Sequence, residues 1–183
     1  MEKLARELNE RFRNSGPREV LAWFSSAYAG KIAFSTSLGA EDQAILHMIW
    51  KEALPVRVFT LDTGRMFQET YDLVDINRSK FNLPIEVYFP DALRVEAMVR
   101  EKGINLFYES IENRQFCCTI RKIEPLMRAL AGMEVWITGM RRNQSVTRTG
   151  AGRVEWEPRH GLLKLNPLKC RSGQDAQLPE WQG

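Results

Sequence analysis

Apolar residues recur along the chain in two alternating patterns, one of short unbroken runs and one with helical spacing. The short runs, which predict buried strands, are residues 31–34, 56–61, 85–88 and 134–139. The amphipathic stretches, which predict helices, are residues 41–53, 67–81, 92–102 and 119–130, and two more helices are expected within the first 30 residues. Strands that alternate with helices are typical of a parallel sheet covered on both faces. The pattern therefore predicts a three-layer αβα domain with a mainly parallel sheet.

The alternation weakens toward the C-terminus. Residues 154–156 and 162–165 fit two short strands around a turn, whereas the segment after Pro167 contains glycine, proline and polar residues without periodicity. We therefore expect one α/β domain over residues 1–168 and a divergent, disordered tail over residues 169–183.

Composition narrows the class of protein. The 183 residues suit one domain, and the net charge of +3 is too small and scattered to predict a nucleic-acid partner. The chain has no apolar run of the roughly 20 residues that a membrane span needs, and its N-terminus lacks the apolar centre of a signal peptide. We expect a cytoplasmic protein without a membrane partner. In that reducing compartment, adjacent cysteines suit a metal or redox role better than a disulfide.

Three polar segments follow predicted strands, at the edge where open α/β sheets bind ligands. They are residues 35–42, 62–65 and 140–145. The first is rich in hydroxyls, bends at Gly39 and opens a helix, which predicts an anion site, although an ordinary helix cap has the same pattern. The second contains Gly64, which lets a ligand approach the backbone, or else forms a plain βα turn. Arg142 of the third segment and Arg148, shortly after it, suit phosphate or sulfate oxygens, with a solvated charge run as the alternative.

Cys117 and Cys118 stand at the predicted start of a helix, just ahead of Arg121 and Lys122. A helix N-terminus and nearby cations lower the pKa of a thiol, which favours the thiolate that binds metal or attacks as a nucleophile. A pair of buried thiols is the alternative. The chain contains no CxxC motif, and Cys170 is its remaining cysteine. One copy of the chain therefore cannot supply a site with four cysteines.

Four motifs in this order resemble the assimilatory adenylylsulfate (APS) and phosphoadenylylsulfate (PAPS) reductases. They are Ser-x-Ser-Leu-Gly-Ala-Glu-Asp from residue 35, Leu-Asp-Thr-Gly-Arg from residue 61, Cys-Cys-x-x-Arg-Lys-x-x-Pro-Leu from residue 117, and Trp-Ile-Thr-Gly-x-Arg-Arg-x-Gln-Ser-x-x-Arg from residue 136. The resemblance covers about residues 24–168, and the cysteine pair resembles the iron–sulfur, APS-reducing branch.

The resemblance implies an adenine nucleotide α-hydrolase-like fold and the reduction of APS to sulfite and AMP with electrons from thioredoxin, within sulfate assimilation and cysteine biosynthesis. The residues that it implies for substrate binding are Ser35, Ser37, Gly39, Leu61, Thr63, Gly64, Arg65, Arg142 and Arg148. It places the catalytic Lys122 between the substrate and a [4Fe–4S] cluster, and it implies Cys117 and Cys118 as two of the four cluster ligands.

The chain departs from this family after Leu168. The family continues with a helical region, a CxxC pair and a tail with a nucleophilic cysteine, which residues 169–183 do not resemble. We therefore expect the nucleotide pocket to survive better than turnover, and a cluster shared between chains or an uncovered face would favour a homo-oligomer. The alternatives are a non-catalytic adenine-nucleotide-binding remnant, a PAPS reductase, and an adenylating enzyme of the ATP-pyrophosphatase type that needs Mg²⁺ and ATP.

Overall fold

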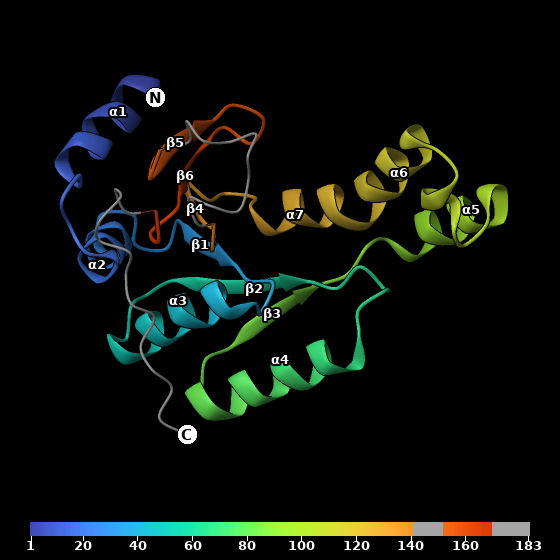
Figure 1. Ribbon diagram of the computed structural model, residues 1–183, viewed down its shortest axis with the longest axis horizontal. Helices are drawn as coiled ribbons and strands as arrows, with labels where there is room; N and C mark the ends of the chain where they lie inside the picture. The colour runs from blue at the N-terminus through green and yellow to red at the C-terminus, as the bar shows by residue number, and fades with distance from the viewer. Residues whose placement is uncertain (141–151, 170–183) are drawn as a thin grey trace.

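The computed structural model describes residues 1–140 and 152–169. Within these residues the strands form one sheet with the order β3-β2-β1-β4-β6-β5 (Figure 1). The strands are β1 (Ile32–Ser35), β2 (Arg57–Leu61), β3 (Ile85–Tyr88), β4 (Val135–Ile137), β5 (Val154–Glu157) and β6 (Leu162–Leu165). Neighbouring strands run parallel, except that β5 pairs with β6 in the antiparallel sense at one edge. The predicted, mainly parallel sheet is confirmed.

Helices connect the strands as the apolar spacing predicts. They are α1 (Glu2–Arg11), α2 (Pro17–Ala27), α3 (Ala40–Lys51), α4 (Gln68–Phe81), α5 (Ala92–Lys102), α6 (Ile111–Cys118) and α7 (Glu124–Ala129). A 3₁₀ turn, η1 (Leu106–Tyr108), precedes α6, and a π-helical segment, η2 (Thr119–Ile123), joins α6 to α7. None of these described helices combines the length and the apolar composition that crossing a membrane requires.

Consecutive side chains of a strand point to opposite sides of the sheet. Because both sides of the central strands pack into apolar cores, these strands are apolar on both faces. Ile32 and Phe34 of β1 join the larger core, which also contains residues from α1, α2 and α3. Ala33, between them, joins a second core on the other face, where Leu126 and Ala129 of α7 pack. Unbroken apolar runs such as residues 31–34 follow from this two-sided burial.

The helix that carries the cysteine pair begins earlier than the sequence pattern predicts. Ser110 caps α6 by accepting a hydrogen bond from the Asn113 amide at 3.1 Å, and the helical path then runs through Cys118 and η2 into α7. The prediction of a helix start at residue 119 was therefore wrong. Apart from the exposed Ile111, the first turns of α6 are polar, so they carry no apolar stripe that the pattern could detect.

α5, η1 and α6 form a unit with an apolar cluster of its own, at the right of Figure 1 and beyond the carboxyl ends of β2 and β3. Met98, Leu106 and Ile120 form this cluster together with Cys117, which is 7% exposed. The thiol of Cys117 therefore belongs to a small hydrophobic core of this unit.

Arg153 fastens the N-terminal helices to the edge of the sheet. Its guanidinium is buried, and Nη1 donates to the carbonyl oxygens of Phe12 at 2.8 Å and Ser15 at 2.7 Å. Its Nε donates to the carbonyl oxygen of Lys169 at 3.1 Å, so the first residue of the predicted tail packs against the domain. Residues 170–183, the rest of that tail, lie outside the described residues.

Candidate active site

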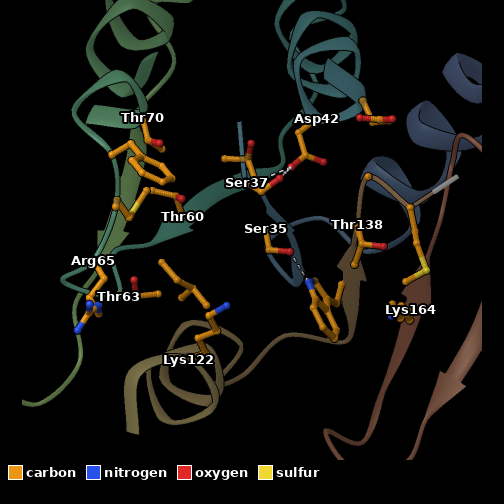
Figure 2. Close-up of a pocket in the computed structure, with 18 residues that line it drawn as sticks. Ser35, Ser37, Asp42, Thr60, Thr63, Arg65, Thr70, Lys122, Thr138 and Lys164 are labelled. Carbon is orange, nitrogen blue, oxygen red and sulfur yellow. Dashed lines mark hydrogen bonds between the residues drawn. The ribbon is translucent and has the colours of Figure 1, made fainter. Parts of the chain in front are cut away.

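A cavity of about 660 Å³ lies at the carboxyl ends of β1, β2 and β4 and extends to β6 (Figure 2). Parallel sheets bind ligands at this edge because the loops that leave neighbouring strands converge there. The predicted site residues that line the cavity are Ser35, Ser37, Leu61, Thr63, Arg65 and Lys122. The structure therefore brings together, around one hollow, residues that lie far apart in the sequence.

The loop after β1 is held by hydrogen bonds within itself. The backbone N–H and the hydroxyl of Ser37 both donate to Asp42 Oδ2, at 2.5 and 2.7 Å. Thr36 Oγ1 accepts from the amide of Leu38 at 3.0 Å, and Leu38 takes the left-handed value φ = 64° while its side chain is buried. Gly39 precedes α3 as its N-cap residue, outside the cavity lining. The local bonds thus fix the entry of the chain into α3.

Asp42 is a buried carboxyl at the first turn of α3, with 5% of its surface exposed. Burial raises the pKa of Asp42, because a buried carboxylate loses its hydration, and the charge of Glu41 raises it further. The two hydrogen bonds from Ser37 act in the opposite direction and favour the charged form. The carboxylate is therefore committed to shaping the loop, and Ser37 is oriented by it.

The loop after β2 is closed by Asp62 and clamped from outside by Arg121. Asp62 Oδ1 accepts a hydrogen bond from the amide of Gly64 at 2.7 Å, and Gly64 has φ = 69°. The buried Arg121 of η2 donates from Nη1 to the carbonyl oxygen of Thr63 at 2.6 Å. A hydrogen bond to the Asp62 carboxylate raises the pKa of Tyr71 of α4. The loop after β2 is thus tied to both α4 and the helix of the cysteine pair.

Lys122 and Arg65, the two predicted site cations among the described residues, point in different directions. Lys122 is exposed and reaches into the cavity from η2, and no hydrogen bond or ion pair holds it within residues 1–140 and 152–169. Arg65 points away from Ser35 and Ser37 in Figure 2. Its guanidinium donates to the carbonyl oxygen of Ile104 at 2.7 Å and to Asn105 Oδ1 at 3.0 Å. Lys122 is therefore placed for an anion, whereas Arg65 ties the loop to the α5–α6 unit.

The cysteine pair lies at the C-terminal end of α6, so the prediction that the pair stands at the start of a helix was wrong. Both thiols are free; Cys117 is buried and Cys118 is half-buried. In the described part of the chain, no three histidine, cysteine or acidic side chains gather as a metal site. These residues alone therefore do not fit a complete cluster site, and they offer two thiols toward one.

Several predicted residues fall elsewhere. Gly64 does not line the cavity, and Arg142, Arg148 and Cys170 lie outside the described residues. The roles that the sequence predicts for the site residues stay predictions.

Several residues that line the cavity were not predicted as site residues. They include Thr60, Thr70, Trp136, Thr138 and Lys164, of which Thr70 comes from α4 and the others come from the strands or directly follow them. Lys164 carried a signal, because a lysine inside the apolar run 162–165 has to point somewhere that tolerates a cation. Trp136 begins the fourth motif, but an aromatic residue in a strand is commonly part of the core, so nothing in the motif pointed to a place in the cavity.

The fold and the position of the cavity define the class of protein. Solved structures with the same arrangement include the phosphate complex of phosphoadenylyl-sulfate reductase from Candida auris, with a TM-score of 0.78 and 27% identity over 93% of this chain and 80% of that one. Yeast FAD synthetase, at 14% identity and a TM-score of 0.51, shares the fold over 92% of this chain and 54% of its own. The chain has an adenine nucleotide α-hydrolase-like fold.

Sequence comparison narrows this class to one family. Residues 31–177 match the phosphoadenosine phosphosulfate reductase domain, and the chain belongs to this family. It is 47% identical over 137 residues to an adenosine 5'-phosphosulfate reductase of Allochromatium vinosum. This match covers 75% of this chain and 54% of that protein. It is 40% identical over 179 residues to 5'-adenylylsulfate reductase 3, chloroplastic, of Arabidopsis thaliana. This match covers 93% of this chain and 38% of that protein. The chain thus spans about half, or less, of these relatives.

Proposed function

We propose that the chain carries the nucleotide-binding part of an APS reductase, which reduces APS to sulfite and AMP. The observation that carries the proposal is the cavity in which the hydroxyl-rich loop after β1 faces Lys122, one helical turn after Cys118. Hydroxyls and an exposed ammonium suit a phosphate or sulfate group, and the free cysteine pair lies on the same continuous helical path. These features support a sulfonucleotide as the substrate.

APS is favoured over PAPS by the names of the relatives. Those from Allochromatium vinosum and Burkholderia cepacia, at 47% and 44% identity, are both named adenosine 5'-phosphosulfate reductase. The structure with the PAPS-reductase name is 27% identical. PAPS reduction is therefore the second candidate, and it differs by the additional 3'-phosphate that the cavity would have to accept.

The proposed reaction balances with a dithiol as the reductant. The sulfur of APS is at oxidation state +6 and that of sulfite at +4, so two electrons are required. Thioredoxin, the proposed partner, supplies them when its two thiols become a disulfide, and the bond between sulfur and the bridging phosphate oxygen breaks to release AMP. Within this reaction Lys122 would stabilise negative charge on the substrate's oxygens.

We further propose that Cys117 and Cys118 supply two thiolates to a [4Fe–4S] cluster, whose remaining ligands would come from outside the described residues. Adjacent free cysteines next to Arg121 and Lys122 support this, since cations stabilise thiolates. The same free thiols support a reducing compartment such as the cytoplasm. Iron and acid-labile sulfide, measured after anaerobic purification, test the cluster: about four of each per chain is expected, and none would contradict it.

The experiment that tests the function measures sulfite release and AMP binding in the same preparation. The chain is incubated with APS or with PAPS, thioredoxin, thioredoxin reductase and NADPH, and AMP binding is measured by calorimetry. Sulfite from APS that depends on thioredoxin supports the proposal, and Lys122→Met should abolish it. The matched control is Lys102→Met, at an exposed position in the last turn of α5.

Two other outcomes separate the alternatives. AMP binding without sulfite release from either nucleotide would contradict the reductase and favour the nucleotide-binding remnant. Absence of both AMP binding and sulfite release would reject the adenine nucleotide as ligand. Release of pyrophosphate from ATP with Mg²⁺ would instead favour the adenylating enzyme.

A further inference from the structure

We infer that Lys164 is a further anion-binding residue of the cavity, held in place by Trp136; the inference rests on the proposed function and deepens it. Lys164 lies in the middle of β6, and in the parallel register it stands directly beside Trp136 of β4. Both side chains line the cavity, and Lys164 does so with only 8% of its surface exposed. The cavity therefore has a lysine in its floor in addition to Lys122 at its side.

The indole of Trp136 is fixed by contacts around it. Its Nε1–H donates to Ser35 Oγ at 2.8 Å, and the ring of His160 packs edge-on at 5.5 Å between ring centroids. Lys164 Nζ lies 5.0 Å from the centroid of the same indole. A cation over an aromatic face is attracted by the negative charge of that face. The fixed ring therefore attracts the ammonium at the floor of the cavity and is one of the contacts that Lys164 makes there.

The hydrogen bond from the indole also leaves the hydroxyl proton of Ser35 available for donation. A hydroxyl has one donor, and because Ser35 Oγ accepts the indole N–H, its own O–H stays available. In the described part of the chain no acceptor takes that proton. Ser35, Trp136 and Lys164 lie on β1, β4 and β6, which are neighbours in the sheet, so one connected strip crosses the cavity floor.

Lys122 and Lys164 lie on opposite sides of Ser35 in Figure 2. A tetrahedral anion above Ser35 would meet an ammonium on either side and a hydroxyl donor below it. This arrangement suits the 5'-phosphate of an adenine nucleotide, because positive charge from two elements compensates its negative charge. Lys164 thus contributes affinity for the phosphate group and none for the nucleoside.

Calorimetry with AMP and with adenosine tests this assignment. Lys164→Met should weaken AMP binding at least tenfold and change adenosine binding less than twofold. Lys164→Arg, which keeps the charge, should recover most of the affinity for AMP. Trp136→Phe removes the bond to Ser35 and should weaken AMP severalfold. Lys102→Met is the control, and circular dichroism with a thermal melt confirms that each variant is folded.

The other outcomes distinguish a failure of the role of Lys164 from a failure of the proposed function. Equal losses for AMP and adenosine, or no loss for either, would overturn the role of Lys164 while leaving nucleotide binding intact. If the unaltered chain binds neither ligand, the proposed function fails, and inorganic sulfate becomes the probe. Sulfate should then raise the melting temperature of the unaltered chain and of Lys102→Met but not of Lys164→Met; the same rise in all three would overturn the anion site itself.

Discussion

Gly139 and Asp42 touch so closely that a side chain at residue 139 has no room. A Cβ atom on Gly139 would lie 1.7 Å from Asp42 Oδ1 and 2.9 Å from its Cγ. Asp42 in turn accepts both hydrogen bonds from Ser37. The end of β4 and the start of α3 therefore form one packed unit through which the loop after β1 is positioned. This unit lies at the rim of the cavity, which Gly139, Asp42 and Ser37 all line.

Gly139→Ala should push the Asp42 carboxylate away and break its bonds to Ser37. We expect a loss of about 1–3 kcal/mol in the free energy of unfolding, the usual cost of inserting a group into packed space, together with weaker AMP binding. Urea unfolding followed by fluorescence measures the first and calorimetry the second. Gly16→Ala is the matched control, because its Cβ would meet nothing within 4 Å. Equal stability of both variants would contradict the close contact.

Asp42→Asn should change how stability depends on pH. Burial raises the pKa of Asp42 above its ordinary value of 3.8, so the folded chain holds this proton more tightly than the unfolded chain does. The Asp42 carboxyl therefore lowers the free energy of unfolding as the pH rises from about 3.8 through the raised pKa. Asparagine does not titrate, so the stability of the variant relative to the unaltered chain should increase over that window. Unfolding free energies from about pH 4 to pH 7 measure this, and parallel curves would count against it.

Arg121→Met should loosen the loop after β2. The variant loses the hydrogen bond to the carbonyl oxygen of Thr63, and a hydrogen bond to a charged group contributes about 1.5–3 kcal/mol. We expect the Gly64 amide to exchange with deuterium at least tenfold faster, and AMP to bind more weakly. Arg100→Met, at an exposed position on α5, serves as the comparison. Unchanged exchange at Gly64 would show that Arg121 does not clamp the loop.

The two cysteines should differ in reactivity and in their effect on stability. In the metal-free chain, iodoacetamide should alkylate the half-buried Cys118 before the buried Cys117, as mass spectrometry of the peptides would show. Cys117→Ser buries a hydroxyl in the apolar cluster and should cost about 1–3 kcal/mol, whereas Cys118→Ser should stay within about 0.5 kcal/mol. Equal alkylation rates would contradict the burial of Cys117.

The site could be predicted from sequence where a loop directly follows a strand. Ser35, Ser37 and Thr63 stand at strand ends, and a parallel sheet gathers such ends at one edge. Lys164 and Trp136 could not be paired in this way, because their contact depends on the register of β4 against β6. The order β1-β4-β6 places strands side by side that are far apart in the sequence.

The sequence by itself determined the α/β class, most of the strand and helix positions and the family, because hydrophobic periodicity and short motifs are local properties of the chain. Tertiary structure added the packing that accompanies the start of α6 at Ile111, because Cys117 is buried among residues of α5 and η1 while the first turn carries no apolar stripe. It also turned Arg65 toward Asn105 and set Lys164 over the indole of Trp136. These contacts join segments far apart in the chain, and no local pattern records which partners packing will bring together.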